Sequence, residues 1–208
     1  MRKLLIGLAV LGVLVVVVGL TVFSWGTGQY NNLVVLQEKV KSSWSQVENV
    51  YQRRMDLIPN LVNTAKGYAT HERETFKQVI EARAKASQVN VDVSKLLNGN
   101  GGVLTPAMVQ QFQSAQGDLS SALGRLMVVM EKYPDLKANT LFERLMDEIA
   151  GTENRISVER RNFNEVAQTY NQVRRQFPTI LIAGYLGFQE YPYFEADKNA
   201  KTAPKAEF

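Results

Sequence analysis

The stretch YQRRMDLIPNLVNTAKGY, residues 51–68, places a proline inside a helical pattern and a glycine shortly after it. Pro59 has no backbone N–H and disfavours helical dihedrals at the residue before it, a cost of ~3 kcal/mol in a helix interior. Apolar residues nevertheless recur at steps of three and four on both sides of it, as in a helix packed along a seam. The pattern predicts a long helix that is kinked near Pro59 but continuous through it.

The length of this helix leaves two architectures open. Unbroken from Asn31 to Asn90 it spans about 90 Å, whereas the last long helix, from Thr140 to Phe177, spans on the order of 57 Å. The first helix either overhangs a three-helix bundle as a stalk, or folds back between Pro59 and Gly67 to make a four-helix bundle. The unbroken seam favours the continuous helix. The residues of this seam are Leu33, Leu36, Val40, Trp44, Val47, Tyr51, Arg54, Ile58, Leu61, Ala65 and Tyr68.

Local signals mark where the later helices begin. Asparagine and glycine in the stretch NVDVSKLLNGNGGVLTP, residues 90–106, interrupt the helical pattern and predict a loop, centred on residues 99–102. Thr105 is a candidate N-cap with Pro106 at the first helical position, and Thr140 with Glu143 resembles a capping box. The fold class is therefore all-α: an N-terminal transmembrane helix followed by an antiparallel bundle of three to four long helices.

The N-terminus carries the membrane signal. The uncharged run from Leu4 to Trp25 is long enough, as a helix, to cross a hydrocarbon core of ~30 Å. Arg2 and Lys3 before it favour a cytoplasmic N-terminus with the bundle on the outer side of a bacterial cell membrane, although Lys39 and Lys41 weaken that bias. The run exceeds the apolar core of a cleaved signal peptide, which favours an uncleaved signal anchor. Residues 4–25 are expected to contact the lipid bilayer.

The 208 residues and 45% hydrophobic content fit a membrane segment plus one domain. We expect an anchor at 1–28, a helical bundle at 29–178 and an aromatic C-terminal tail at 179–208. The absence of cysteine and the single histidine, His71, argue against disulfides, thiolate nucleophiles and most transition-metal sites. A net charge of +4, dispersed among acidic residues, argues against a nucleic-acid partner.

Two charged residues fall on apolar seams. A buried charge is costly unless it is paired, so Arg54 and Glu159 form a candidate buried ion pair. Alternatively, both side chains extend from the edge of the seam into water.

A polar face runs along the first helix across Pro59, and it consists of Asn49, Arg53, Asp56, Asn60 and Asn63. Two roles are open besides that of a solvated face. The side chains of Asp56, Asn60 and Asn63 are candidates to bind the backbone groups that the proline releases. Alternatively, Arg53, Asp56, Asn60 and Asn63 form a surface for a partner protein.

The C-terminal tail concentrates apolar and aromatic residues after Pro178, in a segment too short to span a bilayer. We expect it first to cover one end of the bundle. The alternatives are contact with the membrane surface or with a partner. Its aromatic residues are Tyr185, Phe188, Tyr191, Tyr193 and Phe194.

Three stretches carry a resemblance to a known family. The first is residues 30–76, which contain the specific stretch YQRRMDLIPNLV, and the others are ERRNFNEVAQTYNQVRRQFP at 159–178 and FQEYPYFEAD at 188–197. They resemble segments of the LemA family of bacterial membrane-anchored helical proteins. The resemblance covers nearly the whole chain after the anchor. It implies an N-terminal transmembrane helix and an antiparallel helical bundle, and it brings no catalytic residue, substrate or cofactor.

No common catalytic template is present in the sequence, which lacks Gly-x-Ser-x-Gly, a phosphate loop and His-Glu-x-x-His. We therefore expect a non-enzymatic protein without a cofactor, acting as a scaffold or adaptor for unidentified membrane or envelope proteins. A self-assembling, membrane-organising protein is the alternative, and an enzyme of unrecognised chemistry is a remote one.

Overall fold

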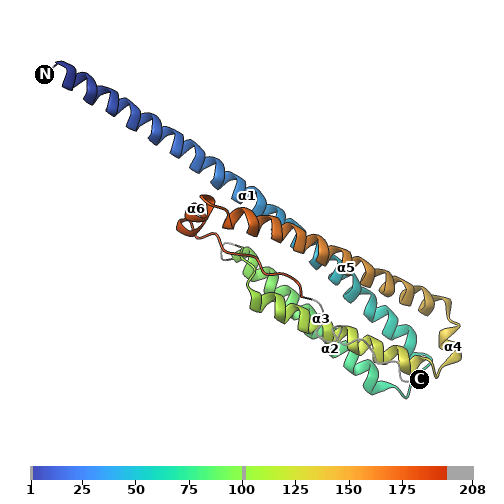
Figure 1. The fold of residues 1–208 in the computed structure, drawn as a ribbon. Coiled ribbons are helices and arrows are strands. Elements are labelled where there is room, and N and C mark those ends of the chain that lie inside the picture. Colours follow the sequence, from blue (N-terminus) through green and yellow to red (C-terminus); the bar gives the residue numbers. More distant parts are fainter. Residues whose placement is uncertain (1, 100–101, 196–208) are drawn as a thin grey trace, which may run out of the picture.

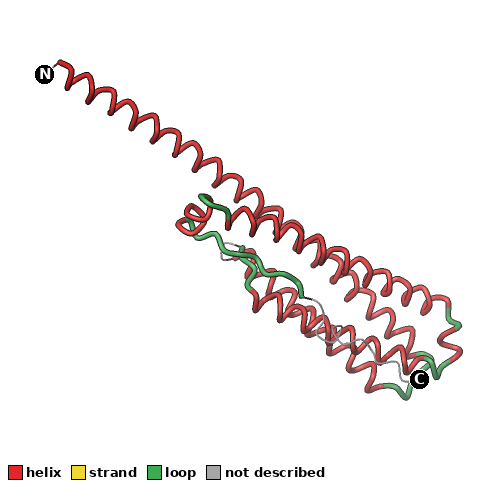
Figure 2. Tube along the Cα trace, viewed as in Figure 1, coloured by secondary structure: helices red, strands yellow, loops and turns green. Residues whose placement is uncertain are grey.

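The computed structural model describes the backbone of residues 2–99 and 102–195 and the side chains of residues 5–97 and 102–195. This part of the chain is helical and has no strand, and the first half of α1 projects from one end of a rod-shaped bundle (Figures 1 and 2). The helices are α1 (Arg2–Lys66), α2 (Arg73–Gly99), α3 (Pro106–Met130), α4 (Pro134–Lys137), α5 (Thr140–Arg175) and α6 (Thr179–Tyr185).

The first long helix both overhangs the bundle and is followed by a reversal of the chain. α1 continues through Pro59 without interruption and ends at Lys66, and residues 67–72 then turn the chain so that α2 runs back beside α1. The expectation of a single helix continuing past Gly67 is wrong, and the bundle has four long helices. The loop predicted over residues 90–106 is also wrong up to Gly99, because α2 continues to that residue. Gly67 is a poor helix former, and a fold-back there lets the apolar side chains of α2 join the same core.

A residue of α2 compensates for the proline in α1. Pro59 cannot donate a hydrogen bond to the carbonyl of Met55, and that carbonyl instead accepts one from Nε of Arg83 at 2.8 Å. A hydrogen bond from a charged donor stabilises by ~1.5–3 kcal/mol, which offsets much of the lost helical bond. The prediction that polar side chains of α1 itself would bind this group is wrong for Asp56, Asn60 and Asn63.

Within the bundle, α1 packs mainly against α5, and α2 packs mainly against α3. Long helices that follow one another along the chain run antiparallel (Figure 1). The predicted α1 seam is confirmed: every member is buried except Tyr68, which lies in the turn after the helix. The sequence also predicts an apolar seam from Leu141 to Phe177 in the last long helix, and these two residues are exposed because they lie at its ends. The periodicity thus identified the buried face along the length of the bundle and failed at the helix termini.

The caps agree with the sequence at one helix and shift by one residue at another. Oγ1 of Thr105 accepts a hydrogen bond from the backbone N–H of Met108, as expected of an N-cap. At α5 the cap is Asn139, whose Oδ1 accepts from the N–H of Phe142, and Thr140 is the first helical residue. The predicted cap at Thr140 is therefore wrong by one position.

An aromatic cluster joins three helices and the C-terminal segment. The ring of Trp44 in α1 lies 5.2 Å from Phe112 of α3, 5.5 Å from Phe163 of α5 and 5.6 Å from Phe194. Edge-to-face and stacked pairs of this kind add ~0.5–1.5 kcal/mol beyond the burial of their area. The tail therefore contributes to the core of the bundle itself.

After α6 the chain reverses and runs back along the bundle as an extended segment, residues 188–195 (Figure 2). Gly187 has φ +75°. Its N–H donates to the carbonyl of Gly184, and the N–H of Phe188 donates to the carbonyl of Ala183. This is the Schellman arrangement, in which glycine adopts a left-handed conformation that other residues disfavour. The turn directs the tail onto the groove between α5 and the rest of the core.

Candidate interaction surfaces

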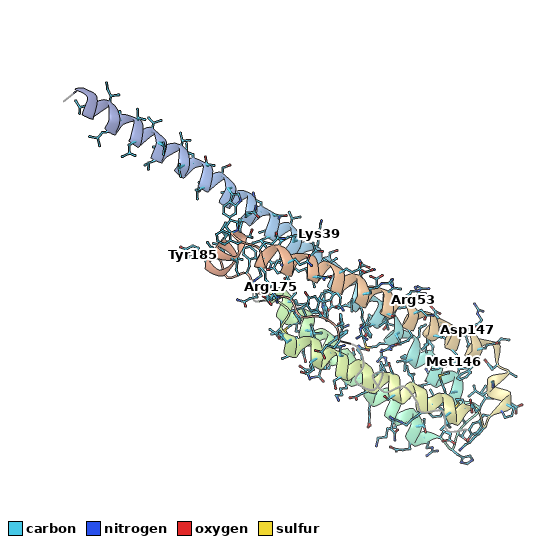
Figure 3. The ribbon with its side chains drawn as sticks, viewed as in Figure 1. Lys39, Arg53, Met146, Asp147, Arg175 and Tyr185 are labelled. Carbon is cyan, nitrogen blue, oxygen red and sulfur yellow. The ribbon has the colours of Figure 1, made fainter. Side chains whose placement is uncertain are left out.

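The polar face of α1 is open to solvent along its whole length. Asn49, Arg53, Asp56, Asn60 and Asn63 are all exposed, and their positions span about 21 Å along the helix. Nη2 of Arg53 donates to Glu148 of α5 at 2.7 Å, and Oδ1 of Asp56 accepts from Gln52 at 2.8 Å. Arg53, labelled in Figure 3, therefore lies at the seam with α5, whereas Asp56, Asn60 and Asn63 present polar groups outward.

Arg54 is buried with 1% of its surface exposed, but its partner is not the predicted one. Nη1 donates to Glu153 of α5 at 2.6 Å and to Ser120 of α3 at 3.0 Å, and Nη2 donates to Oε1 of Gln116 at 2.8 Å. Glu159 instead accepts a hydrogen bond from Asn162 on its own helix. The predicted Arg54–Glu159 pair is wrong because the stagger of α1 against α5 brings Glu153 level with the guanidinium.

The Arg54 cluster connects three helices through one side chain. Its guanidinium also lies over the ring of Tyr51, 5.2 Å from the centroid, which adds a cation–π contact. Glu153 retains 60% side-chain exposure, so water screens the ion pair from one side. The arrangement is suited to holding α1, α3 and α5 in register, since its charge is enclosed by neighbours from each of them.

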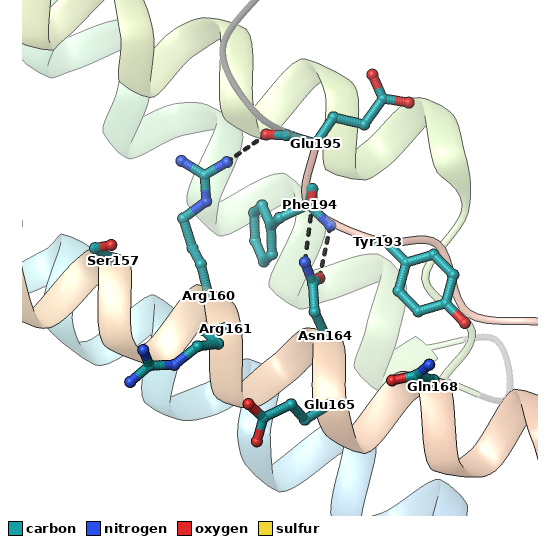
Figure 4. A pocket seen from close by; sticks show the side chains of 9 residues that line it. All are labelled: Ser157, Arg160, Arg161, Asn164, Glu165, Gln168, Tyr193, Phe194 and Glu195. Carbon is teal, nitrogen blue, oxygen red and sulfur yellow. Dashed lines mark hydrogen bonds between the residues drawn. The ribbon is translucent and has the colours of Figure 1, made fainter. Parts of the chain in front are cut away.

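Two asparagines of α5 hold the extended tail by its backbone. Asn171 donates from Nδ2 to the carbonyl of Tyr191 at 2.8 Å and accepts from its N–H at 3.0 Å. Asn164 makes the same pair of bonds with Phe194, at 3.0 and 2.8 Å (Figure 4). Seven residues of helix rise by about 10.5 Å and three of extended chain by about 10 Å, so the two spacings match.

This asparagine clamp, Asn164 and Asn171, was not predicted from the sequence. The available signal was the seven-residue spacing of two amides on the face of α5 that also carries apolar residues. Phe188, Tyr191 and Phe194 are buried, but this part of the tail packs along the bundle, whereas the sequence predicted a tail that covers one end of it. Tyr185 and Tyr193 remain exposed, and the predicted tail beyond residue 195 lies outside the described residues.

Charge and burial reinforce the tail contact. Arg174 and Arg175 bind Glu190 at 2.9 and 2.6 Å, and the hydrogen bond from Arg175 lowers the pKa of the Glu190 carboxyl. Burial beside Tyr191 raises the pKa of Tyr170 to about 12, and burial also raises the pKa of Tyr191. The contact is therefore most favourable with Glu190 ionised and both phenols neutral.

An open groove of about 630 Å³ lies where α5 meets the end of the described tail (Figure 4). Nη2 of Arg160 donates to the carbonyl of Glu195 at 2.7 Å, and its guanidinium lies 5.0 Å from the centre of the Phe194 ring. Arg161 and Glu165 line the rim. The groove is wide and of mixed charge, and the guanidinium of Arg160 is already bound to the tail. It therefore does not form a defined pocket for a small ligand.

The described part of the chain contains no candidate metal site. Among the side chains that the structure describes, no three of the His, Asp and Glu residues are grouped to hold a metal ion. Among the described helices, α1 has a segment long and apolar enough to cross a membrane, and the bundle does not cover that segment. The side chains of Arg2 and Lys3, on which the predicted orientation depends, lie outside the described ones.

Comparison with known proteins places the chain in a family. MamQ, a magnetosome protein of Magnetospirillum gryphiswaldense, is 30% identical over 186 residues, covering 85% of this chain and 68% of MamQ. Magnetosome protein MamQ 1 of Paramagnetospirillum magneticum is 27% identical over 194 residues, with the same coverage. Protein LemA of Metamycoplasma hominis is 25% identical over 171 residues, covering 82% and 71%. The LemA family model matches residues 43–208, and the chain therefore belongs to the LemA family.

Proposed function

We propose that this protein is a non-enzymatic, membrane-tethered scaffold or adaptor whose docking surface is the polar face of α1. The observation that carries the proposal is the continuity of α1, which runs as one helix from the membrane-length apolar segment to the polar face. From Trp25 to Asn60 this helix extends about 50 Å. A partner bound at Asn60 would therefore be held at a set height from the bilayer.

The chemistry of the surface supports a protein partner. Asp56, Asn60 and Asn63 offer one carboxylate and two amides on successive turns, and each amide both donates and accepts hydrogen bonds. Such groups are suited to matching backbone or polar side chains of another protein, in contrast to a basic patch for nucleic acid. The Arg54 cluster directly behind this face holds the helix in place, which lowers the entropy lost on docking.

The relatives support the setting. Those named as magnetosome proteins are associated by that name with a bacterial organelle, and a membrane location agrees with the apolar segment of α1. We further propose that the N-terminus is cytoplasmic and that the bundle and its envelope partners lie on the outer side.

The test is in-cell crosslinking of the full-length, membrane-inserted protein followed by mass spectrometry. The variant is D56A/N60A/N63A, and the matched control is Q88A/D92A, which removes the same negative charge and an amide from exposed positions of α2. We expect one membrane or envelope protein to crosslink to the wild type and to the control and to be lost from the variant.

Two other outcomes would redirect the assignment. Crosslinks retained in the variant would show that the polar face is only a solvated surface. Crosslinks confined to copies of this chain, unchanged by the variant, would favour the alternative of a self-assembling protein that organises the membrane.

A further inference from the structure

The segment around α6 exposes large apolar side chains and is itself uncharged. From Gln176 to Gln189 the chain has no charged residue. Phe177, Leu181 and Tyr185 are 81%, 64% and 90% exposed, and Ile180 and Leu186 are exposed beside them. Thr179 and Ala183, on the other side of α6, are buried. We call the five exposed residues the α6 apolar surface.

This surface lies beside the end of the membrane-length segment of α1. Ile182 Cδ1 lies 3.9 Å from the position a side-chain Cβ would take at Gly26, the residue directly after the apolar run. One turn further, Thr179 donates to Oε1 of Gln29 at 3.2 Å, and Phe188 packs against Tyr30 at 5.8 Å. α6 is thus attached to α1 within about one helical turn of the membrane-length segment.

The placement of α6 identifies what covers its outer face. The exposed side chains of α1 before Trp25 form the lipid-facing surface of the anchor, and the α6 apolar surface continues it sideways at the same end of the bundle (Figures 1 and 3). Tyr185, labelled in Figure 3, projects at that end. Aromatic and aliphatic side chains at this depth are typical of segments that lie in the headgroup and upper acyl region.

We infer that α6 is a second membrane contact, in which Phe177, Leu181 and Tyr185 enter the interfacial region of the leaflet from which α1 emerges. A single transmembrane helix leaves the bundle free to tilt and rotate about its axis. A second contact beside it fixes both, and so sets which side of the bundle faces away from the membrane. The inference requires that α1 spans the bilayer, and it is independent of any partner at the polar face.

Because the chain has no cysteine, single-cysteine variants of the full-length protein allow a direct test. L181C and V128C are labelled with an environment-sensitive fluorophore in nanodiscs that hold one copy each, made of phosphatidylcholine and phosphatidylglycerol with nitroxide-labelled acyl chains. Val128 is a matched control because it is 65% exposed on α3, at the end of the bundle near α4. We expect several-fold stronger lipid quenching at residue 181 than at residue 128, and protection of residue 181 from aqueous iodide.

Serine substitutions at Phe177 and Tyr185 in the L181C protein should reduce the lipid quenching while circular dichroism shows the same helix content. Equal quenching at residues 181 and 128, or iodide access at 181 equal to that at 128, would overturn the inference. Protection from iodide that appears only in nanodiscs with two copies would also overturn it, because the cover would then be a second chain.

Discussion

Replacing Asn171 by alanine should release the tail from the bundle. The amide makes two hydrogen bonds with the backbone of Tyr191 and a third with the hydroxyl of Tyr193 at 3.0 Å, and it is buried. Each bond contributes ~1 kcal/mol net, and the substitution leaves the buried N–H and carbonyl of Tyr191 without partners. We expect the free energy of holding the tail to fall by about 3 kcal/mol.

The effect should be local. The four long helices bury their seams against each other, so opening of residues 188–195 exposes the tail groove without separating α1 from α5. A loss of about 3 kcal/mol corresponds to an increase of more than ~10²-fold in the opening constant. Hydrogen exchange of the backbone amide of Phe194 in the full-length protein measures it, because the partner of that amide, Asn164, is unchanged by the substitution.

The matched control is Asn154→Ala, which removes an exposed asparagine from the same helix. Exchange at Phe194 should be unchanged in that control. If Asn171→Ala also left exchange at Phe194 within a few-fold of the wild type, Asn171 would not hold the tail, and the remaining contacts would have to account for its position.

Three further outcomes follow from the same contacts. Arg83→Met should lower the free energy of unfolding, measured by thermal unfolding, by about 1–2 kcal/mol. In a Pro59→Ala background the loss should be less than about 0.5 kcal/mol, because residue 59 then supplies the missing helical donor. Equal losses in both backgrounds would contradict the compensation. Glu153→Gln should lower the free energy of unfolding by about 2 kcal/mol, because the buried guanidinium of Arg54 loses its counter-charge. Glu159→Gln should change it by less than about 0.5 kcal/mol. A larger loss for Glu159→Gln than for Glu153→Gln in thermal unfolding would favour the Arg54–Glu159 pair instead. The contribution of Tyr170 to the free energy of unfolding should be complete below pH 10 and fall as the pH rises toward 12, because the folded protein holds the Tyr170 proton that the unfolded chain loses near pH 10. Urea unfolding at stepped pH, with phenolate absorbance, checks this. A free energy of unfolding that does not change over this pH range would contradict it.

The placement of α6 gives the proposed adaptor a defined geometry. One end of the bundle is joined to the membrane through α1 and, by our inference, through Phe177, Leu181 and Tyr185. The polar face lies further along the same continuous helix. A partner at that face would meet a surface whose height and direction are both set by contacts at the bilayer.

The sequence alone determined the all-helical class, the buried faces of the long helices and the membrane-length segment, although it missed the turn after Lys66. These features follow from local patterns: a period of three to four residues identifies an apolar seam, and an uncharged run of sufficient length identifies a membrane helix. The α1 seam was correct even across Pro59, since a proline changes one hydrogen bond without changing which side chains face the core.

Only the tertiary structure decided which distant groups meet. Arg54 pairs with Glu153 and not with Glu159, six residues or about 9 Å further along α5, because the axial stagger of two helices is set by all their contacts together. Likewise, the donor to the carbonyl freed by Pro59 comes from Arg83 on another helix. Periodicity defines a face of each helix but carries no information about the offset between helices, and that offset determines which polar groups of neighbouring helices meet.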